Sequence, residues 1–157
     1  GMRGRRRVST MLDLVDGLEP SGPSNFAAAC KRFALTHRSK GVLVVLSDFF
    51  DKSGFENGLR YISGGKYDTF AVQVLSPQEI EPELSGDLKL KDIEDGDFAE
   101  VSITGPLIQK YKSNLNAYCL SLKDYITRRG GSYLFSSTSV PFETLVLNYL
   151  RERRLLG

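Results

Sequence analysis

The feature that most constrains the fold is the apolar run Val42–Leu46, which gives way at once to Ser47 and Asp48. Five consecutive apolar residues, most of them valine, are typical of a strand buried on both faces, as in a parallel sheet covered by helices. In open α/β sheets, ligands bind just beyond the carboxyl ends of the strands, which is where Asp48 stands. Asp48 therefore either takes part in chemistry or metal binding, or caps the turn that leads into the next helix.

Further strands and helices alternate around this run and predict an α/β fold. Thr69–Leu75 and Ser132–Ser136 have the composition of strands, and strand, helix and strand between residues 42 and 75 predict a right-handed βαβ unit. Helices are expected over residues 8–18, after an N-cap at Ser24, after a capping box formed by Ser53 and Glu56, from Gly105 to Gly130, and from Pro141 to Arg153.

The segment between the second strand and the long helix departs from this alternation. Residues 76–82 read as an acidic loop, and Leu88–Ile93 and Phe98–Ile103 are two alternating runs that predict a β-hairpin. The acidic turn between the runs lacks the spacing of a calcium loop. We therefore expect one domain over residues 2–157, with a three-layer, mostly parallel α/β sheet and the hairpin at its periphery.

Composition excludes several classes of function. The formal net charge of +2 is too small to predict nucleic-acid binding. Basic clusters at residues 3–7 and 151–154 are expected to be solvated, with contact to an acidic partner as the alternative. Cys30 and Cys119 fall on apolar helix faces, which indicates buried thiols in a reducing compartment. No apolar run has the length of a membrane span, so we expect a cytoplasmic protein with no membrane segment.

The common enzyme signatures are missing. The sequence holds no Gly-rich dinucleotide loop, no Walker loop, no Gly-x-Ser-x-Gly elbow and no His-rich metal set. The only histidine, His37, has no visible nucleophile partner and is expected to be structural. What remains is a hydroxyl at Ser24 and a carboxylate at Asp48. Both are hard oxygen ligands, which suit magnesium or manganese better than zinc.

Several stretches, spread over nearly the whole chain, resemble one family. The sequence is similar to the bacterial proteins of domain-of-unknown-function family 58, whose domain resembles the von Willebrand factor A fold. The stretches that carry the resemblance are Leu18–Phe26, Val44–Asp51, Val72–Ile80, the hairpin with its long helix, and Ser136–Phe142. The resemblance implies a von Willebrand factor A-like sheet, to which the family adds the hairpin.

The resemblance also implies a metal-ion-dependent adhesion site. In such a site an Asp-x-Ser-x-Ser loop, a Thr or Ser on a second loop and an Asp on a third loop hold the ion. Ser24 matches the second loop and Asp48 the third, whereas the first loop has no counterpart in the chain. The chain is thus expected to correspond to the carboxyl-terminal part of an A-like domain, with weak magnesium binding or none. Ser47, Phe49 and Asp51 are expected to contact a protein partner.

Three functions remain open. The resemblance favours a non-enzymatic protein-interaction module that acts with a MoxR-type AAA ATPase in protein assembly or metal insertion. The alternative is a metal-dependent phosphoryl hydrolase that uses Asp48 and Asp51, although no general base such as histidine is seen beside them. A structural remnant without activity is the third.

The expected absence of the first strands has a consequence for self-association. Val42–Leu46 would have a hydrogen-bonding neighbour on one side only, and an unpaired apolar edge is a template for pairing with another chain. The apolar residues Leu12, Val15, Phe26 and Phe33 of the flanking helices would be partly uncovered. We therefore predict a homodimer through the exposed strand edge.

Overall fold

The structure is a computed structural model that describes residues 6–19, 24–37, 39–63, 67–91, 98–141 and 143–147. Residues 143–147 are helical and follow the named elements in the chain. Those elements are α1 (Arg6–Asp16), α2 (Phe26–Thr36), β1 (Gly41–Ser47), α3 (Phe55–Ile62), β2 (Tyr67–Leu75), α4 (Pro77–Ile80), β3 (Gly86–Lys91), β4 (Phe98–Ile103), α5 (Gly105–Thr127) and β5 (Ser132–Ser137).

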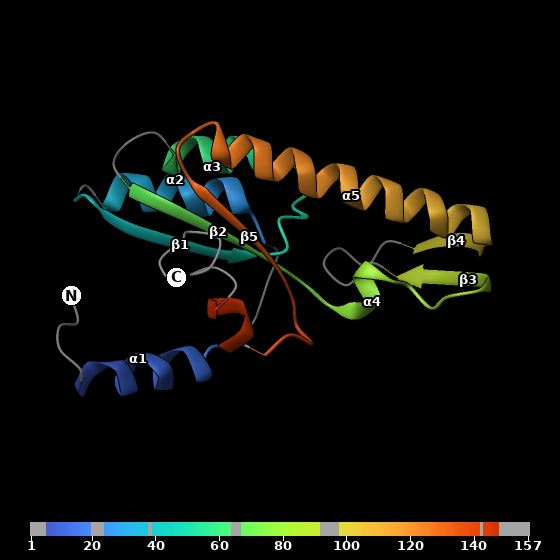
Figure 1. Cartoon of the computed structure of the whole chain (residues 1–157), viewed down its shortest axis with the longest axis horizontal. Coiled ribbons are helices and arrows are strands. Elements are labelled where there is room, and N and C mark those ends of the chain that lie inside the picture. Colours follow the sequence, from blue (N-terminus) through green and yellow to red (C-terminus); the bar gives the residue numbers. More distant parts are fainter. Residues whose placement is uncertain are drawn as a thin grey trace.

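The central sheet is parallel and has the order β1-β2-β5. Val44 of β1 lies opposite Phe70 of β2, and Gln73 of β2 lies opposite Phe135 of β5. Helices flank the sheet, so the predicted mixed α/β class and the parallel pairing of all three strands are confirmed (Figure 1). Among the described residues, β1 is at the edge of the sheet and has β2 as its neighbour on one side only.

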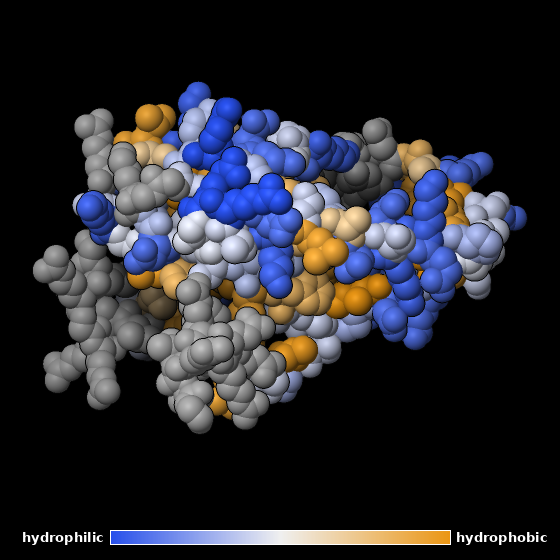
Figure 2. Space-filling model, turned by 45° about the horizontal axis from the view of Figure 1, so that its top comes forward, coloured by the Kyte–Doolittle hydropathy of each residue, from blue (hydrophilic) through white to orange (hydrophobic). Residues whose placement is uncertain are grey.

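The core lies between the sheet and the helices α2, α3 and α5 (Figure 1). The strands alternate as a pleated sheet requires, and Leu43 and Val45 of β1 point to this side. Helices α2 and α3 approach closely because Gly58 has no side chain: a Cβ there would lie 2.5 Å from the Phe26 ring. The core residues are Cys30, Phe49, Phe55, Leu59, Ile62, Ala71, Leu122 and Ile126. Figure 2 shows hydrophilic residues over much of the outside of this helical layer, with apolar surface between them.

The second face of the sheet is exposed at β1 and half-buried at β2 and β5. Val42, Val44 and Leu46 of β1 point to it and are 67%, 55% and 70% exposed. Helix α1 and residues 143–147 lie on this side, but α1 is separate from the strands in Figure 1. The apolar stripe of α1 is exposed over Met11, Leu12, Leu14 and Val15. The sequence expectation of an uncovered stripe is therefore met in α1.

In α2 the expectation also agrees with the structure, but the exposure is smaller. Phe26 and Phe33 are half-buried and pack against the core, because α2 lies on the sheet. The apolar face of α2 therefore belongs mainly to the helical layer.

Two predicted helix caps are wrong. Asn25, not Ser24, caps α2: its Oδ1 accepts a hydrogen bond of 2.8 Å from Ala28 N. At α3 the cap is Gly54, with φ of 79° and no side-chain bond. The Ser53 hydroxyl donates to Asp51 instead. Asp51 also accepts from Phe26 N, so the same carboxylate bonds next to the start of α3 and at the start of α2.

The segment after β2 contains a short helix that the sequence reading missed. Within residues 76–82, α4 begins with a complete capping box: Ser76 accepts from Glu79 N and the Glu79 carboxylate accepts from Ser76 N. The hairpin is confirmed, as β3 and β4 pair antiparallel. The hairpin forms a sheet of its own beside the first turns of α5 (Figure 1). The end of the predicted first strand, at Ile93, lies outside the described residues.

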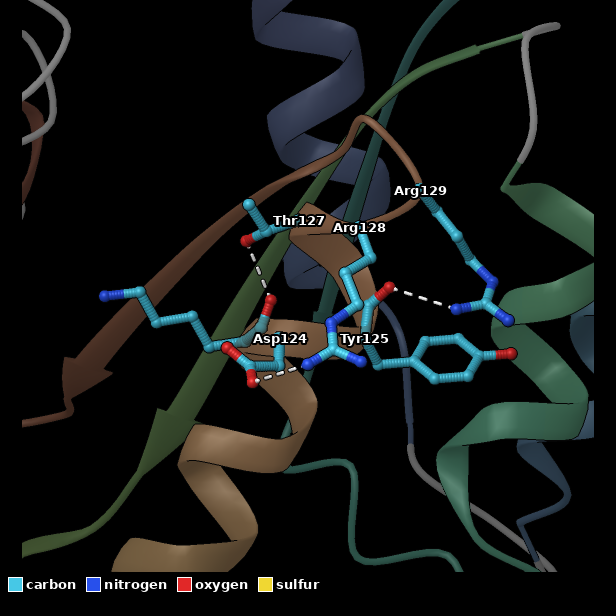
Figure 3. Close-up of polar contacts among 6 residues, drawn as sticks. Asp124, Tyr125, Thr127, Arg128 and Arg129 are labelled. Carbon is cyan, nitrogen blue, oxygen red and sulfur yellow. Dashed lines mark hydrogen bonds and ion pairs between the residues drawn. The ribbon is translucent and has the colours of Figure 1, made fainter.

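The last turns of α5 are closed by side chains and by two glycines. Thr127 Oγ1 donates to Lys123 O at 2.8 Å, and the Arg129 guanidinium lies 3.5 Å from the centre of the Tyr125 ring (Figure 3). Gly130 then takes φ of 76°, which a residue with a Cβ rarely adopts. A Cβ on Gly131 would lie 2.8 Å from Ile126 Cγ2. The two glycines therefore let the chain turn tightly from α5 into β5.

Candidate functional site

The candidate site is the loop that follows β1, over residues 48–51, at the carboxyl edge of the sheet. Two side chains bond to the backbone just ahead of them: Ser47 Oγ accepts from Phe49 N and Asp48 Oδ1 from Phe50 N, both at 2.9 Å. These are the short-range bonds by which Ser and Asp stabilise turns. The loop is thus a tight turn built by its own polar residues.

The second residue of the turn, Phe49, has an unusual backbone. Its φ is 63°, in the left-handed region that a bulky side chain rarely adopts. Two features hold it there. The side chain is 1% exposed and meets the Phe26 ring edge to face at 5.5 Å, and the Phe49 carbonyl accepts a hydrogen bond from the Tyr118 hydroxyl of α5. Such a constrained residue is a pointer to function when its surroundings hold it firmly.

A buried amide on β2 supports the loop from below. Gln73 is fully buried, and its Nε2 donates to the Asp48 carbonyl at 3.0 Å. Its Oε1 accepts from the Tyr133 hydroxyl of β5 at 2.7 Å. The amide is therefore paired at both ends, as a polar group in a core must be. The backbone of Asp48 is consequently tied to both other strands of the sheet.

Asp51 joins the loop to the start of α2. Its Oδ2 accepts from Phe26 N and its Oδ1 accepts from Ser53 N, each at 2.8 Å. These hydrogen bonds hold the pKa of Asp51 below its ordinary value. The bond from the Ser53 hydroxyl has the largest effect, followed by the bonds from the backbone N–H groups of Phe26 and Ser53. Since Ser24 is two residues before Phe26, this contact brings the Ser24 segment against the loop.

The structure therefore brings four of the five predicted site residues into one turn and sets the fifth next to it. Ser47, Asp48 and Asp51 lie on the loop with Asp48 exposed, and Ser24 is exposed at the start of α2. Phe49 is different because its side chain points into the core and is not available to a partner. The neighbouring Phe50 is 39% exposed and is the aromatic residue that the loop presents outward.

The sequence reading missed three residues that hold this loop: Gln73, Tyr118 and Tyr133. Gln73 carried a signal that could have found it, because a single amide inside an otherwise buried strand needs polar partners. Tyr118 and Tyr133 carried none beyond being aromatic residues in a predicted helix and strand. Their hydroxyls find their acceptors across 69 and 60 residues of chain.

The donor set fits a magnesium ion only in part. The Ser24 hydroxyl and the Asp48 carboxylate are hard oxygen ligands. Asp48 accepts hydrogen bonds from Ser47 Oγ and Phe50 N through Oδ1. Within the described ranges, no three residues among His, Cys, Asp and Glu are grouped so as to hold a metal ion. Asp51, the nearest further carboxylate in the chain, already accepts hydrogen bonds through both oxygens. Water would have to fill most of the coordination sphere of an ion at this loop.

No helix in the part of the chain that the structure describes has the length and apolar character needed to cross a membrane.

Comparison with known proteins gives a family and bacterial relatives. The sequence model of the family described as "Protein of unknown function DUF58" matches residues 2–118. The chain is 26% identical over 155 residues to uncharacterized protein Rv1480 of Mycobacterium tuberculosis and to uncharacterized protein Mb1516 of Mycobacterium bovis. These matches cover 96% of the chain and 48% of each relative, so the chain spans about half the length of these proteins.

A shorter relative, uncharacterized protein MAV169 of Mycobacterium avium, is 24% identical over 155 residues, which are 96% of the chain and 90% of that protein. No solved structure matches the chain.

Proposed function

The chain belongs to the DUF58 family of proteins of unknown function, and from that premise we propose that it is a non-enzymatic protein-interaction module. Its binding surface is the loop at residues 48–51 together with Ser24. The partner is a MoxR-type AAA ATPase, and the pair acts in protein assembly or metal insertion.

The observation that carries this proposal is the way the loop is held. Gln73 of β2, Tyr118 of α5 and the Phe26 amide of α2 each bond to a different residue of the loop. Asp48 and Phe50 face outward from this rigid support. A surface that is ordered before binding loses little entropy when a partner docks, which favours recognition.

The same bonds weigh against a phosphoryl hydrolase that uses Asp48 and Asp51. Both Asp51 oxygens accept hydrogen bonds that fix the starts of α2 and α3. The single histidine, His37, cannot act as a base at the loop. It follows α2, and its backbone carbonyl accepts a hydrogen bond from the hydroxyl of Tyr67, the first residue of β2. His37 thus lies at the amino end of the strands, whereas Asp48 lies at their carboxyl end. The His37 ring is stacked on the Phe33 ring, with 4.5 Å between the ring centres.

We also propose that the isolated chain forms a dimer through β1. The strand is seven residues long and, in the part of the chain that the structure describes, has one hydrogen-bonded neighbour. It carries neither a charge nor a proline, and these are features by which proteins protect an edge strand. A two-fold axis through Val44 would pair the two copies antiparallel and place Val44 opposite Val44.

The experiment for the proposed function is co-purification of the tagged full chain with the MoxR-type ATPase of the same organism. We expect Asp48→Ala and Phe50→Ala to weaken the recovery of the ATPase. Two matched controls lie elsewhere on the surface: Asp68→Ala removes an exposed carboxylate at the start of β2, and Tyr61→Ala removes an aromatic residue with 40% exposure on α3. Recovery that is equal for all four variants would rule out the loop as the binding surface.

A further inference from the structure

A groove lies directly beside the loop, between the loop, α4 and α5. Its volume is about 440 Å³, and it is lined by Phe50, Glu79, Tyr111, Asn114, Leu115 and Tyr118. We refer to it as the aromatic groove. Phe50 comes from the loop, Glu79 from α4 and the remaining four residues from one stripe of α5. The groove is thus an extension of the proposed binding surface, and it was assembled from three segments that are distant in the sequence.

The walls of the aromatic groove are aromatic rings, two of which are partly exposed to solvent. Phe50 and Tyr111 are 39% and 37% exposed, and the Phe50 and Tyr118 rings lie 5.6 Å apart at an angle of 47°. Exposed rings that gather in a concave site with a few polar groups are typical of binding pockets. Of the lining residues, Glu79 is charged and none is basic.

The two tyrosines are held in place by their hydroxyls. Tyr111 donates to the Glu79 carbonyl at 2.6 Å and Tyr118 to the Phe49 carbonyl. Glu79 is itself fixed, since its carboxylate accepts from Ser76 N at 2.7 Å in the capping box of α4. Because the hydroxyls are used inside the chain, what the groove offers to a ligand is the ring faces, in a fixed position.

Four carboxylates lie close enough to the groove to act on its two tyrosines. The pKa of Tyr118 is raised to about 12, mainly by burial and in addition by the nearby carboxylates of Glu56, Asp48 and Asp51. Burial and then Glu79 raise the pKa of Tyr111 in the same way. Lys112, which follows Tyr111 on α5, is already paired with Glu81 at 3.0 Å. The carboxylates around the groove therefore favour a cationic ligand over an anionic one.

We infer that the aromatic groove binds an arginine side chain of the partner protein, with its guanidinium group stacked on the Phe50 and Tyr111 rings and directed toward the Glu79 and Asp48 carboxylates. Arginine fits both properties of the groove, because its planar cation stacks on aromatic faces and pairs with carboxylates. Lysine has the charge but not the planar group. The inference rests on the proposed function only in taking the ligand from a protein partner.

The test is a titration of the full chain with N-acetyl-arginine amide, followed by two-dimensional amide NMR in the presence of a chelator so that no divalent cation competes. We expect saturable shifts confined to residues 48–51, α4 and residues 111–118. N-acetyl-lysine amide should bind more weakly, because its ammonium group cannot stack as a plane or pair with a carboxylate through two hydrogen bonds. N-acetyl-glutamine amide, which has no charge, should cause no saturable shift. Equal shifts with all three probes, or shifts elsewhere on the chain, would overturn the inference.

A pair of variants on one helix sharpens the test. Asn114→Arg places a cation in the aromatic groove itself and should abolish binding of the probe. Ser113→Arg is the matched control, because it adds the same side chain at an exposed neighbouring position that does not line the groove. If both variants bind the probe as the unchanged chain does, the groove is not the site.

The outcome can be separated from that of the proposed function. If the ATPase is recovered through the loop but the arginine probe does not bind, the proposed function stands and the arginine site is wrong. If the probe binds and no ATPase is recovered, the arginine site stands and the named partner is wrong.

Discussion

Gln73 and Asp48 are joined by a hydrogen bond of 3.0 Å from a fully buried side-chain amide to the backbone carbonyl of an exposed loop. Through it, the interior of β2 controls the position of the residue that the chain presents at the edge of the sheet. Such an arrangement separates two tasks: Asp48 can meet a partner while its backbone is held by a residue that no partner touches.

The Gln73→Leu variant should therefore be destabilised, because it leaves the Asp48 carbonyl and the Tyr133 hydroxyl without their partner. We expect a loss of about 1–3 kcal/mol in the free energy of unfolding, measured with urea. Gln78→Leu, at an exposed position on α4, serves as the control. In the double variant Gln73→Leu/Tyr133→Phe the loss should be smaller than the sum of the single losses, since the unpaired hydroxyl is removed as well. Strict additivity would show that the two side chains are not coupled.

Phe49 and Phe50 are adjacent in sequence and should behave in opposite ways. Phe49→Ala removes a ring that is 1% exposed and should lower the free energy of unfolding by about 3–5 kcal/mol. Phe50→Ala should change stability much less, because its ring is already 39% exposed, and should instead weaken binding of the partner and of the arginine probe. Thermal unfolding and the titration, run on both variants, check the two effects. Similar stability losses in both would contradict the assigned orientation of the turn.

Asp51 should make the stability of the chain depend on acid pH. Its pKa is lower in the folded chain than the ordinary value of 3.8, since the carboxylate accepts hydrogen bonds. Its contribution is therefore fully present above about pH 3.8 and is lost as the pH falls through the lower, folded pKa. Asp51→Asn should be less stable than the unchanged chain at neutral pH, with the difference narrowing below that value. Asp68→Asn, at an exposed carboxylate, is the control, and unfolding by urea at a series of pH values is the measurement.

The proposed dimer predicts a specific effect of Val44→Lys. In a two-fold antiparallel pairing the two new ammonium groups would face each other across the interface, and like charges directly opposite destabilise strand pairing. Light scattering at high micromolar concentration should show a dimer for the unchanged chain and a monomer for this variant. Leu120→Lys is the matched control, because Leu120 and Val44 are both 55% exposed and Leu120 lies on α5. A monomeric unchanged chain would contradict the proposal.

Magnesium binding should be weak. Ser24 and Asp48 supply two oxygen donors, and water would complete the shell of an ion held there. Calorimetric titration with magnesium chloride should therefore give no micromolar affinity. A micromolar affinity that is lost in both Ser24→Ala and Asp48→Ala would show that the residues around the loop complete the site.

The sequence by itself determined most of the elements and their order, with α4 as the exception. The apolar run at residues 42–46, the strand at 69–75 and the long helix after Gly105 were all found, because hydrophobic periodicity and turn residues act over a few neighbouring positions. The position of the candidate site followed from the same local pattern, since a carboxylate after a buried strand must lie at the carboxyl edge of the sheet.

Only the tertiary structure decided how that edge is organised. Asp51 accepts a hydrogen bond from Phe26 N at the start of α2, and this bond spans 25 residues. Phe49 turns inward and Phe50 outward because the Tyr118 hydroxyl, 69 residues away, holds the Phe49 carbonyl and the core receives the ring. The exposure of β1 on the second face of the sheet likewise follows from tertiary packing, because α2, α3 and α5 all pack on the first face. Contacts of this kind join residues that no local pattern relates, so they arise only when the chain is folded.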